Sequence, residues 1–496
     1  MIWPMYIGID LGTSGIKVIL LDAQDHVIDH VIDSESAPLT VSRPQPLWSE
    51  QDPAHWWAAL QQCLDALSAR RDLSSVQAIG LAGQMHGATL LDAQHQILRP
   101  AILWNDGRSG AQCQQLTERV PELSDITGNL AMPGFTAPKL LWIREHEPDI
   151  FARVAMVLLP KDYLRFCLSG DFASDMSDSA GTLWLDMAAR DWSDELLCVC
   201  GLSRNQMPKL YEGNQITGVL SSDLAARWGM AQVPLVAGGG DNAAGAVGAG
   251  ILAPGQAMLS LGTSGVYFAV SDGYSANPDS AVHAFCHALP NSWHLMAVTL
   301  SAASCLQWYS EQLMKVPVAE LLAELEQTHD WPDGIPSAAP IFLPYLSGER
   351  TPHNNPNARG VWFGLTHDTD RAAMTYSVLE GVSFALAQGA AALHSASGIP
   401  HEINLIGGGA RSAYWRQLLA DVLNLPLNFR EGGEVGPALG AARLAALAMN
   451  PDVAAATLCP PPPLVSAHQP DPQRHQALTA RYNSFKALYD ALKPHF

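Results

Sequence analysis

A glycine-rich pentapeptide, Leu-Gly-Thr-Ser-Gly, occurs twice in the chain, at residues 11–15 and 261–265. Glycines let backbone N–H groups approach an anion, and the threonine and serine add hydroxyl donors. Alternating β-branched and apolar residues flank both copies and predict a strand on either side of each turn. For one copy alone, an ordinary hairpin turn is the simpler interpretation. Two copies with matching flanks favour two phosphate-binding hairpins in two related lobes.

Two carboxylates stand where phosphate chemistry would need them. Asp10 ends the first predicted strand and is placed to face a phosphate-bound Mg²⁺, and Lys17 on the next strand adds positive charge. Ser260 takes the place of Asp10 in the second copy. Asp241 follows Gly238-Gly-Gly at the start of a predicted short helix. It is either an ordinary helix cap or a general base beside a phosphate cleft, and the three glycines favour the base.

Three further segments carry weaker signals. His86 lies in Gly83-Gln-Met-His-Gly87, at the end of a predicted strand. It either forms a hydrogen bond with a sugar hydroxyl or is a core histidine whose hydrogen bonds are made within the protein. The cluster 104–108 suits a polyol pocket or a plain loop. Residues 407–412 form a glycine-rich turn between a strand and a helix, but Ser412 replaces the third glycine of a dinucleotide fingerprint. The chain contains no Walker A motif, so its nucleotide site is of neither of these types.

Composition limits the class of protein. The 496 residues predict two large domains. The net charge of −20 argues against nucleic acid or an anionic membrane as a partner. The eight cysteines form no CxxC pair and the start of the chain lacks a secretory signal, so we expect a cytoplasmic protein with reduced thiols. The uncharged stretch 242–270 is long enough to span a bilayer, but its six glycines and Pro254 predict a short helix, a turn and a strand pair instead.

Between the two hairpins and after them, strands alternate with helices, which predicts an α/β fold. We place the domain boundary at 235/236, giving an N-terminal lobe of residues 5–235 and a C-terminal lobe of residues 236–496. The expected strands are 76–81, 89–92, 233–237 and 402–406, and the expected helices are 52–68, 139–147, 375–394, 414–422 and 472–492.

At this point the residues resemble a known family. Ile9-Asp10-x-Gly12-Thr13-x-x-x-Lys17 resembles the first phosphate motif of the actin and hexokinase superfamily. Within that superfamily the chain resembles the FGGY carbohydrate kinases over nearly its whole length. The resemblance implies two ribonuclease-H-like lobes with an active-site cleft between them. The further segments that carry it are 134–146, 360–380, 407–410 and 436–442.

The resemblance also implies a reaction and its residues. It implies ATP-dependent phosphorylation of a ketopentose, with Asp241 as the general base for the terminal hydroxyl and Asp10 holding Mg²⁺ through water. The implied sugar ligands are Met85, His86, Asp241 and Asn242. The implied ATP-binding residues are Gly12, Thr13, Ser14, Lys17, Gly262, Thr263, Gly408 and Gly409.

Several alternatives stay open. Glycerol kinases of the family carry Arg-Glu where this chain has Met85-His86, which counts against glycerol. Another ketopentose or a polyol fits the same motifs, because a few donors set stereochemical choice. A sugar or nucleotide sensor without catalysis is disfavoured by the presence of both Asp10 and Asp241. The resemblance alone implies a homodimer.

Overall fold

The structure is a computed structural model that describes residues 4–24, 27–327, 334–431 and 436–496. The chain forms two compact units, each built from three segments. The first unit comprises residues 1–252, 285–293 and 434–462, and the second comprises residues 253–284, 294–433 and 463–496.

This division differs from the boundary expected at 235/236. Strand β15 (Gly239–Gly240) pairs with β5 (Val76–Gly83), so the chain continues in the first unit past residue 236. Helix α15 (Gly436–Met449) returns to that unit and packs on β1 (Met5–Leu11) and β5. The reason lies in two glycines, since a side chain at Gly8 or Gly80 would collide with the α15 carbonyls of Ala438 and Ala441. Helix α15 therefore sits directly on the backbone of the first sheet.

A mixed sheet forms the centre of the first unit, in the strand order β13-β14-β5-β1-β2-β3 with β15 also beside β5. Strands β1, β14 and β15 run parallel to β5, whereas β2 is antiparallel to both β1 and β3. The strands not yet given bounds are β2 (Gly15–Gln24), β3 (Val27–Pro38), β13 (Ile216–Val219) and β14 (Pro234–Val236).

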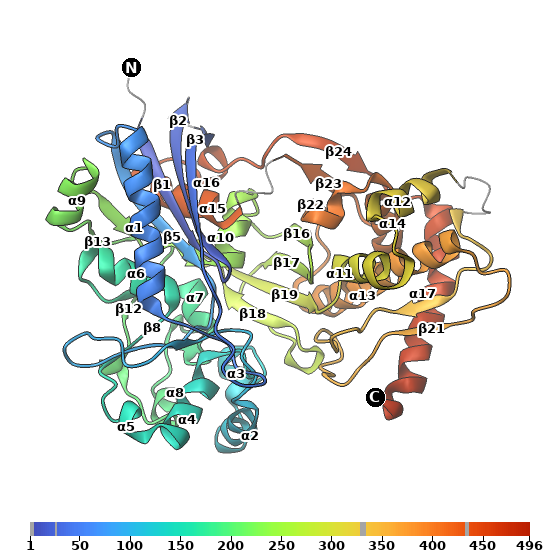
Figure 1. Cartoon of the computed structure of the whole chain (residues 1–496), viewed down its shortest axis with the longest axis horizontal. Helices are drawn as coiled ribbons and strands as arrows, with labels where there is room; N and C mark the ends of the chain where they lie inside the picture. Colours follow the sequence, from blue (N-terminus) through green and yellow to red (C-terminus); the bar gives the residue numbers. More distant parts are fainter. Residues whose placement is uncertain (1–3, 25–26, 328–333, 432–435) are drawn as a thin grey trace. The chain divides into compact units, whose positions relative to one another are not determined.

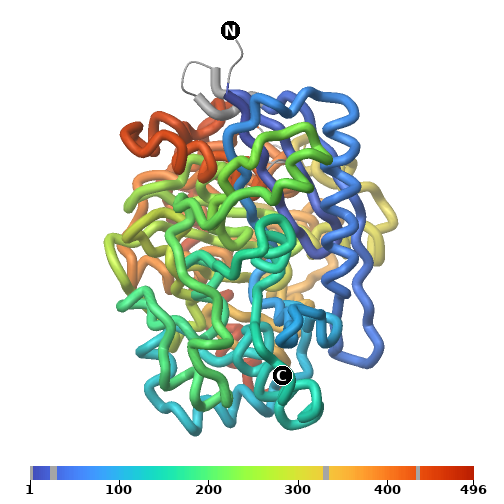
Figure 2. Tube along the Cα trace, turned by 90° about the vertical axis from the view of Figure 1, so that its left-hand side faces the viewer, coloured from blue at the N-terminus to red at the C-terminus, as the bar shows by residue number. Residues whose placement is uncertain are grey.

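Helices cover both faces of this sheet, with α1 (Pro53–Arg70) on one side and α10 (Asp241–Gly248) and α15 on the other (Figure 1). Alternation along β1 explains the layers, because Ile7 and Ile9 join the core under α1 while Tyr6 joins the core under α15. Asp52 caps α1 by accepting from the Ala54 N–H, and Pro53 opens the helix. Helix α16 (Ala455–Leu458) lies beside β3, so late residues border the N-terminal strands (Figures 1 and 2).

Smaller elements complete the first unit. Four strand pairs are β4 (Glu50–Gln51) with β7 (Ala101–Ile102), β6 (Thr89–Leu91) with β8 (Met156–Leu158), β9 (Ala173–Asp175) with β12 (Lys209–Tyr211), and β10 (Leu185–Asp186) with β11 (Asp191–Trp192). The other helices are α2 (Gly110–Arg119), α3 (Leu123–Thr127), α4 (Thr136–His146), α5 (Pro148–Phe151), α6 (Pro160–Ser169), α7 (Met176–Ala180), α8 (Asp194–Val199), α9 (Ser222–Trp228) and the 3₁₀ turn η1 (Arg204–Gln206).

The second unit is built on a sheet with the strand order β18-β19-β17-β16-β22-β23-β24. Its strands are β16 (Gln256–Leu261), β17 (Gly265–Ser271), β18 (His283–Cys286), β19 (Trp293–Thr299), β22 (Glu402–Ile406), β23 (Leu427–Arg430) and β24 (Leu464–His468), and β20 (Ile341–Leu343) pairs with β21 (Val361–Phe363). The helices are α11 (Ala303–Trp308), the π-helix η3 (Tyr309–Met314), α12 (Val318–Gln327), α13 (Arg371–Ser397), α14 (Ala413–Leu423), α17 (Pro472–Leu492) and the 3₁₀ turns η2 (Pro278–Ser280), η5 (Gly408–Arg411) and η6 (Lys493–His495).

The elements expected from the sequence are confirmed, with shifted ends. Strand β22 and helix α17 have the predicted bounds, while α13 extends four residues before and three beyond the expected 375–394. The uncharged stretch 242–270 folds as α10, β16 and β17, as predicted. Strand β15 was not predicted, because two glycines carry no strand signal.

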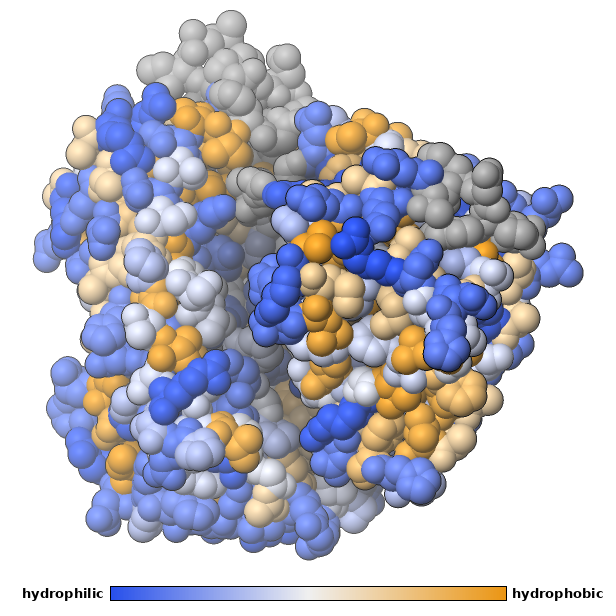
Figure 3. Space-filling view, turned by 45° about the vertical axis from the view of Figure 1, so that its right-hand side comes forward, coloured by the Kyte–Doolittle hydropathy of each residue, from blue (hydrophilic) through white to orange (hydrophobic). Residues whose placement is uncertain are grey.

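Within the described ranges, no helix is long and apolar enough to cross a membrane. On the face seen in Figure 3, hydrophilic residues alternate with smaller groups of hydrophobic ones. The fold class predicted from the sequence, an α/β protein with two domains, is confirmed.

Candidate active site

Three polar residues predicted for the site, Asp10, His86 and Asp241, lie where three parallel strands of the first unit end. Asp10 on β1 stands opposite Ala82 on β5, which in turn stands opposite Gly239 on β15. The loop that contains His86 follows β5, and Asp241 follows β15 directly. Because ligands bind outside the carboxyl ends of parallel strands, this edge is the candidate active site of the unit.

The two carboxylates at this edge interact electrostatically. Burial and the charge of Asp241 raise the pKa of Asp10 from 3.8 to about 7, and Lys17, opposite Asp10 on β2, opposes the shift. Burial also raises the pKa of Asp241 to about 6, against hydrogen bonds from Asn242. Oδ1 of Asp10 is buried and has no hydrogen-bond partner within the described part of the chain. Perturbed carboxylates of this kind are typical of functional sites.

Asp241 is held from both sides. Asn242 donates its backbone N–H and its side-chain amide to Oδ1 of Asp241, at 2.7 and 2.9 Å. The preceding Gly240 donates its N–H to Oγ of Ser177 at 3.0 Å, and that hydroxyl donates to Asp175 at 2.5 Å. Asp241 is the first residue of α10 rather than its cap, since Gly240 occupies the cap position. The orientation of its carboxylate is therefore fixed by neighbours and not by capping.

A buried ionic cluster lies behind this segment. Lys161 is fully buried and contacts Asp162, Asp175 and Asp178 at 2.5, 2.8 and 3.3 Å. Burial opposes the charge of Lys161, but the three carboxyl groups, Asp162 foremost, raise its pKa. Burial raises the pKa of Asp178 well above its ordinary value, and the charge of Lys161 opposes that shift. Through Asp175 and Ser177 the cluster supports the backbone at Gly240.

The loop after β5 is strained at His86, whose φ is +68°. The backbone carbonyl of His86 accepts hydrogen bonds from the Lys139 ammonium at 2.8 Å and from the Thr136 hydroxyl at 3.1 Å. Nδ1 of the ring lies 2.6 Å from the Gly181 carbonyl. A carbonyl can only accept, so Nδ1 carries a proton and, in the neutral ring, Nε2 is the acceptor. The loop therefore presents a ring of fixed tautomer.

Met85 is buried and joins the histidine loop to the Asp241 segment. A side chain at Gly240 would come within 2.9 Å of the Met85 sulfur, and one at Gly181 would come within 2.5 Å of the His86 ring. Both glycines are needed for this close packing. Met85, His86, Asp241 and Asn242, the four predicted sugar ligands, thus lie in one unit and are linked by packing.

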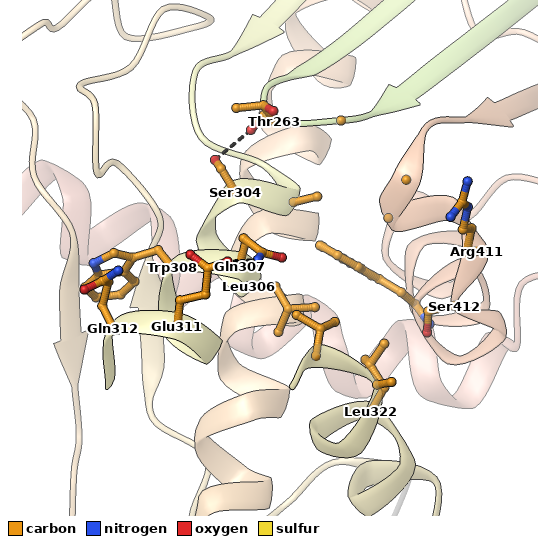
Figure 4. Close-up of a pocket in the computed structure, with 17 residues that line it drawn as sticks. Thr263, Ser304, Leu306, Gln307, Trp308, Glu311, Gln312, Leu322, Arg411 and Ser412 are labelled. Carbon is orange, nitrogen blue, oxygen red and sulfur yellow. Dashed lines mark hydrogen bonds between the residues drawn. The ribbon is translucent and has the colours of Figure 1, made fainter. Parts of the chain in front are cut away.

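In the second unit, the other pentapeptide borders a pocket of about 1040 Å³. Its hairpin is held by the start of α11, because the Ala302 and Ala303 N–H groups donate to the carbonyls of Thr263 and Gly262 at 2.9 and 2.8 Å. Ser304 adds a hydrogen bond from its hydroxyl to the Thr263 carbonyl at 2.7 Å (Figure 4). The carbonyls are thus engaged by the fold, while the exposed Thr263 side chain borders the pocket.

The pocket combines apolar walls with polar groups, as small-molecule sites do. Gly408 and Gly409 line it, and a side chain at Gly408 would meet no protein atom within 4 Å. At Gly409 a side chain would come within 2.7 Å of Leu261. The remaining lining includes Leu306, Gln307, Trp308, Glu311, Leu322, Arg411, Ser412 and Trp415 (Figure 4).

The predicted site residues therefore fall into two groups. Those of the first unit are Asp10, Gly12, Thr13, Ser14, Lys17, Met85, His86, Asp241 and Asn242, and those of the second are Gly262, Thr263, Gly408 and Gly409. No sequence motif indicates a role for Lys139, whose partners are backbone carbonyls, or for Lys161, two of whose partners, Asp175 and Asp178, come from other elements. The pocket wall at 306–322 is part helix and part π-helix and follows no motif either.

Comparison with known proteins identifies the family. Residues 5–248 match the N-terminal domain, and residues 257–449 the C-terminal domain, of the FGGY family of carbohydrate kinases. The chain belongs to this family. As an FGGY kinase it is a sugar kinase, and ATP is the family's phosphoryl donor.

Individual relatives are similar over their full length. The chain is 59% identical over 491 residues to the xylulose kinase of Escherichia coli (strain K12), and the aligned region covers 99% of each chain. It is 55% identical over 491 residues to the xylulose kinase of Klebsiella pneumoniae, again over 99% of both. The crystal structure of a xyloylose kinase from Brucella ovis matches with a TM-score of 0.93 and 47% identity, over 99% of this chain and 100% of that one.

Proposed function

We propose that this FGGY kinase converts ATP and D-xylulose into ADP and D-xylulose 5-phosphate. The observation that carries the proposal is the 59% identity to a xylulose kinase over 99% of both chains. Met85 and His86 stand where glycerol kinases of the family carry Arg-Glu, which supports a sugar other than glycerol. L-xylulose, ribulose and polyols are the competing substrates.

Asp241 is the general base in this proposal. Its pKa of about 6 leaves it ionised at neutral pH and close enough to neutrality to accept a proton effectively. Asn242 occupies Oδ1, so Oδ2 takes the proton from the terminal hydroxyl. The hydroxyl oxygen then forms a bond to the γ-phosphorus as the bond to the bridging oxygen of ADP breaks. Catalysis is mainly positioning and charge neutralisation.

Asp10 is the proposed Mg²⁺ residue. Its buried, unpartnered Oδ1 fits a hydrated cation, and Mg²⁺ commonly uses one or two carboxylates with waters and phosphate oxygens. In this proposal Asp10 holds Mg²⁺ through water. When bound, Mg²⁺ would neutralise phosphate charge. Lys17 across the hairpin adds a second positive charge.

The remaining predicted residues bind the substrates. Gly12, Thr13 and Ser14 of the first hairpin, and Gly262 and Thr263 of the second, hold phosphates. The pocket of the second unit takes the adenosine part, since Gly408 leaves open space where a ligand can approach. Met85, His86, Asp241 and Asn242 bind the sugar.

A coupled ADP-release assay tests the substrate. The panel contains D-xylulose, L-xylulose, D-ribulose, L-ribulose and glycerol, each with ATP and Mg²⁺. We expect kcat/KM for D-xylulose to exceed that for every other member. Higher kcat/KM for a different sugar would overturn the substrate assignment, and absence of sugar-stimulated turnover would overturn the kinase proposal.

Assembly and location belong to the same proposal. A homodimer would have twice the chain mass of 53.2 kDa, which light scattering after size-exclusion chromatography measures directly. A cytoplasmic location predicts recovery in the soluble fraction of gently lysed cells. A monomer mass or recovery outside that fraction would contradict these two points.

A further inference from the structure

A closed ring of three hydrogen bonds joins the first phosphate hairpin to the segment before the sugar loop. The Thr13 hydroxyl donates to Oε1 of Gln84 at 2.9 Å, and Nε2 of Gln84 donates to Oε1 of Gln51 at 3.0 Å. Nε2 of Gln51 then donates to the backbone carbonyl of Thr13 at 2.7 Å. Gln84 and Gln51 are both buried. Buried amides in a fully paired ring hold their neighbours in one arrangement.

The direction of every bond in this ring is determined. The indole N–H of the fully buried Trp56 donates to Oε1 of Gln51 at 3.0 Å, and an indole nitrogen can only donate. Oε1 of Gln51 is therefore the acceptor, and Gln84 must present its NH₂ group to it. The oxygen of Gln84 then faces Thr13, so the Thr13 hydroxyl must be the donor.

The Thr13 oxygen has a further partner. The indole N–H of Trp104 donates to Oγ1 of Thr13 at 2.9 Å. The hydroxyl hydrogen is thus committed to Gln84, and one lone pair is committed to Trp104. In this arrangement the hairpin offers a phosphate its backbone N–H groups and the exposed Ser14, not the hydrogen of the Thr13 hydroxyl.

Gln84 also binds the hairpin strand through its backbone, since its N–H donates to the Leu11 carbonyl at 2.8 Å. Met85 and His86, the proposed sugar ligands, follow it directly. We propose that Gln84 is a positioning residue for phosphoryl transfer, which fixes the first phosphate hairpin relative to the sugar loop by accepting the Thr13 hydroxyl hydrogen. This inference rests on the proposed role of that hairpin in holding ATP phosphates.

A double-mutant cycle tests the proposal. Gln84→Glu sets a carboxylate oxygen against Oε1 of Gln51, so the ring opens and the side chain at position 84 is repelled from its place beside the Thr13 hydroxyl. Thr13→Val removes the hydroxyl itself. The readout is the affinity of β,γ-methylene-ATP with Mg²⁺, measured by titration calorimetry without sugar. We expect each single variant to bind the nucleotide about tenfold more weakly than the wild type. The double variant should be no weaker than either single variant, because both substitutions break the same interaction. Losses that multiply to about a hundredfold would mean that Thr13 contacts phosphate independently, and would overturn the proposal.

Controls separate positioning from general damage. Gln77→Glu makes the same change at an exposed site on β5, the strand that ends just before Gln84, where the side chain donates to the Ser75 carbonyl, so affinity should stay unchanged. Trp56→Phe removes the donor that orients the ring and touches no ligand, so it should weaken affinity about threefold. Wild-type affinity in Gln84→Glu, or in Trp56→Phe if Gln84→Glu fails to fold, overturns the proposal.

The steady-state rates make the two possible failures distinguishable. With D-xylulose, Gln84→Glu should lower kcat/KM for ATP by roughly ten- to a hundredfold, since small misplacements cost up to about 10² in rate. The KM for D-xylulose should change little. If the wild type does not phosphorylate D-xylulose while the binding cycle is non-additive, the proposed substrate fails and the role of Gln84 stands.

Discussion

In the first Leu-Gly-Thr-Ser-Gly hairpin, side chains hold both the hydroxyl and the carbonyl of Thr13, through Gln84 and Gln51. In the second, the start of α11 and the Ser304 hydroxyl hold the carbonyl of Thr263. Asp10 precedes the first hairpin and Ser260 the second, so only one copy carries a carboxylate with a raised pKa. The same five residues therefore join two antiparallel strands in both units, but Leu11 pairs with Ile16 whereas Leu261 pairs with Gly265, so the first turn is one residue longer. The two hairpins also differ in the residue that precedes them and in their tertiary partners.

The largest expected effect is at Asp241, near the first hairpin. Asp241→Asn removes the proposed base and should lower kcat by roughly 10²–10⁴-fold. Because Asp241 belongs to the first unit and the proposed nucleotide pocket is lined by residues of the second, ADP affinity should remain within about twofold, a change of less than 1 kcal/mol. Stopped-time product assays and ADP titration measure the two quantities. Near-normal turnover in this variant would remove the base assignment.

Stability should also distinguish the two hairpins. The pKa of Asp10 is raised from 3.8 to about 7, so its ionisation destabilises the folded state as pH rises through that range. Asp10→Asn should therefore stabilise the protein at pH 8 by up to about 4 kcal/mol, and should give little gain near pH 4. Ser260→Ala should show no such pH dependence. Thermal unfolding midpoints at both pH values measure this. A gain in stability at low pH instead of high pH would contradict the predicted direction of the effect.

The pH dependence of the rate follows from the same carboxylates. Asp241 accepts a proton only when ionised, so kcat/KM at saturating Mg²⁺ should fall about tenfold per pH unit below its pKa of about 6. At low Mg²⁺ an additional fall should begin near pH 7, where protons compete with the metal for Asp10. A pH–rate profile at two Mg²⁺ concentrations checks both. A flat profile between pH 5 and 7 would contradict the proposed base.

The smallest effect is expected in the pocket of the second unit. Gly408→Leu fills open space in the pocket without meeting protein atoms near its Cβ, so folding should be intact. ATP should bind about tenfold more weakly, which corresponds to about 1.4 kcal/mol, whereas the KM for D-xylulose should stay the same. Gly110→Leu is a control for the substitution alone, since Gly110 is exposed, has no positive φ, and a side chain there also meets nothing within 4 Å. Equal ATP affinity in the two variants would argue against nucleotide binding at Gly408.

Much of this site was predictable because its signals are local. Asp10, Lys17 and the hairpins follow from alternation, glycines and repetition, and α17 follows from its cap at Asp471. The supports were not predictable, because they join distant residues. Gln51 and Gln84 meet Thr13 only in the folded sheet, and Lys161 collects carboxyl groups from α6, β9 and α7. The return of α15 to the first unit depends on the packing of Gly8 and Gly80, which no local pattern encodes.

The contrast between the hairpins is tested most directly by a Mg²⁺ titration of D-xylulose-dependent ADP release in the wild type, Asp10→Asn and Ser260→Ala. We predict that Asp10→Asn needs at least about tenfold more Mg²⁺ for its half-maximal rate, a cost of about 1.4 kcal/mol or more, and that Ser260→Ala follows the wild-type curve. An Asp10→Asn curve that coincides with the wild type, or equal shifts in the two variants, would contradict the account.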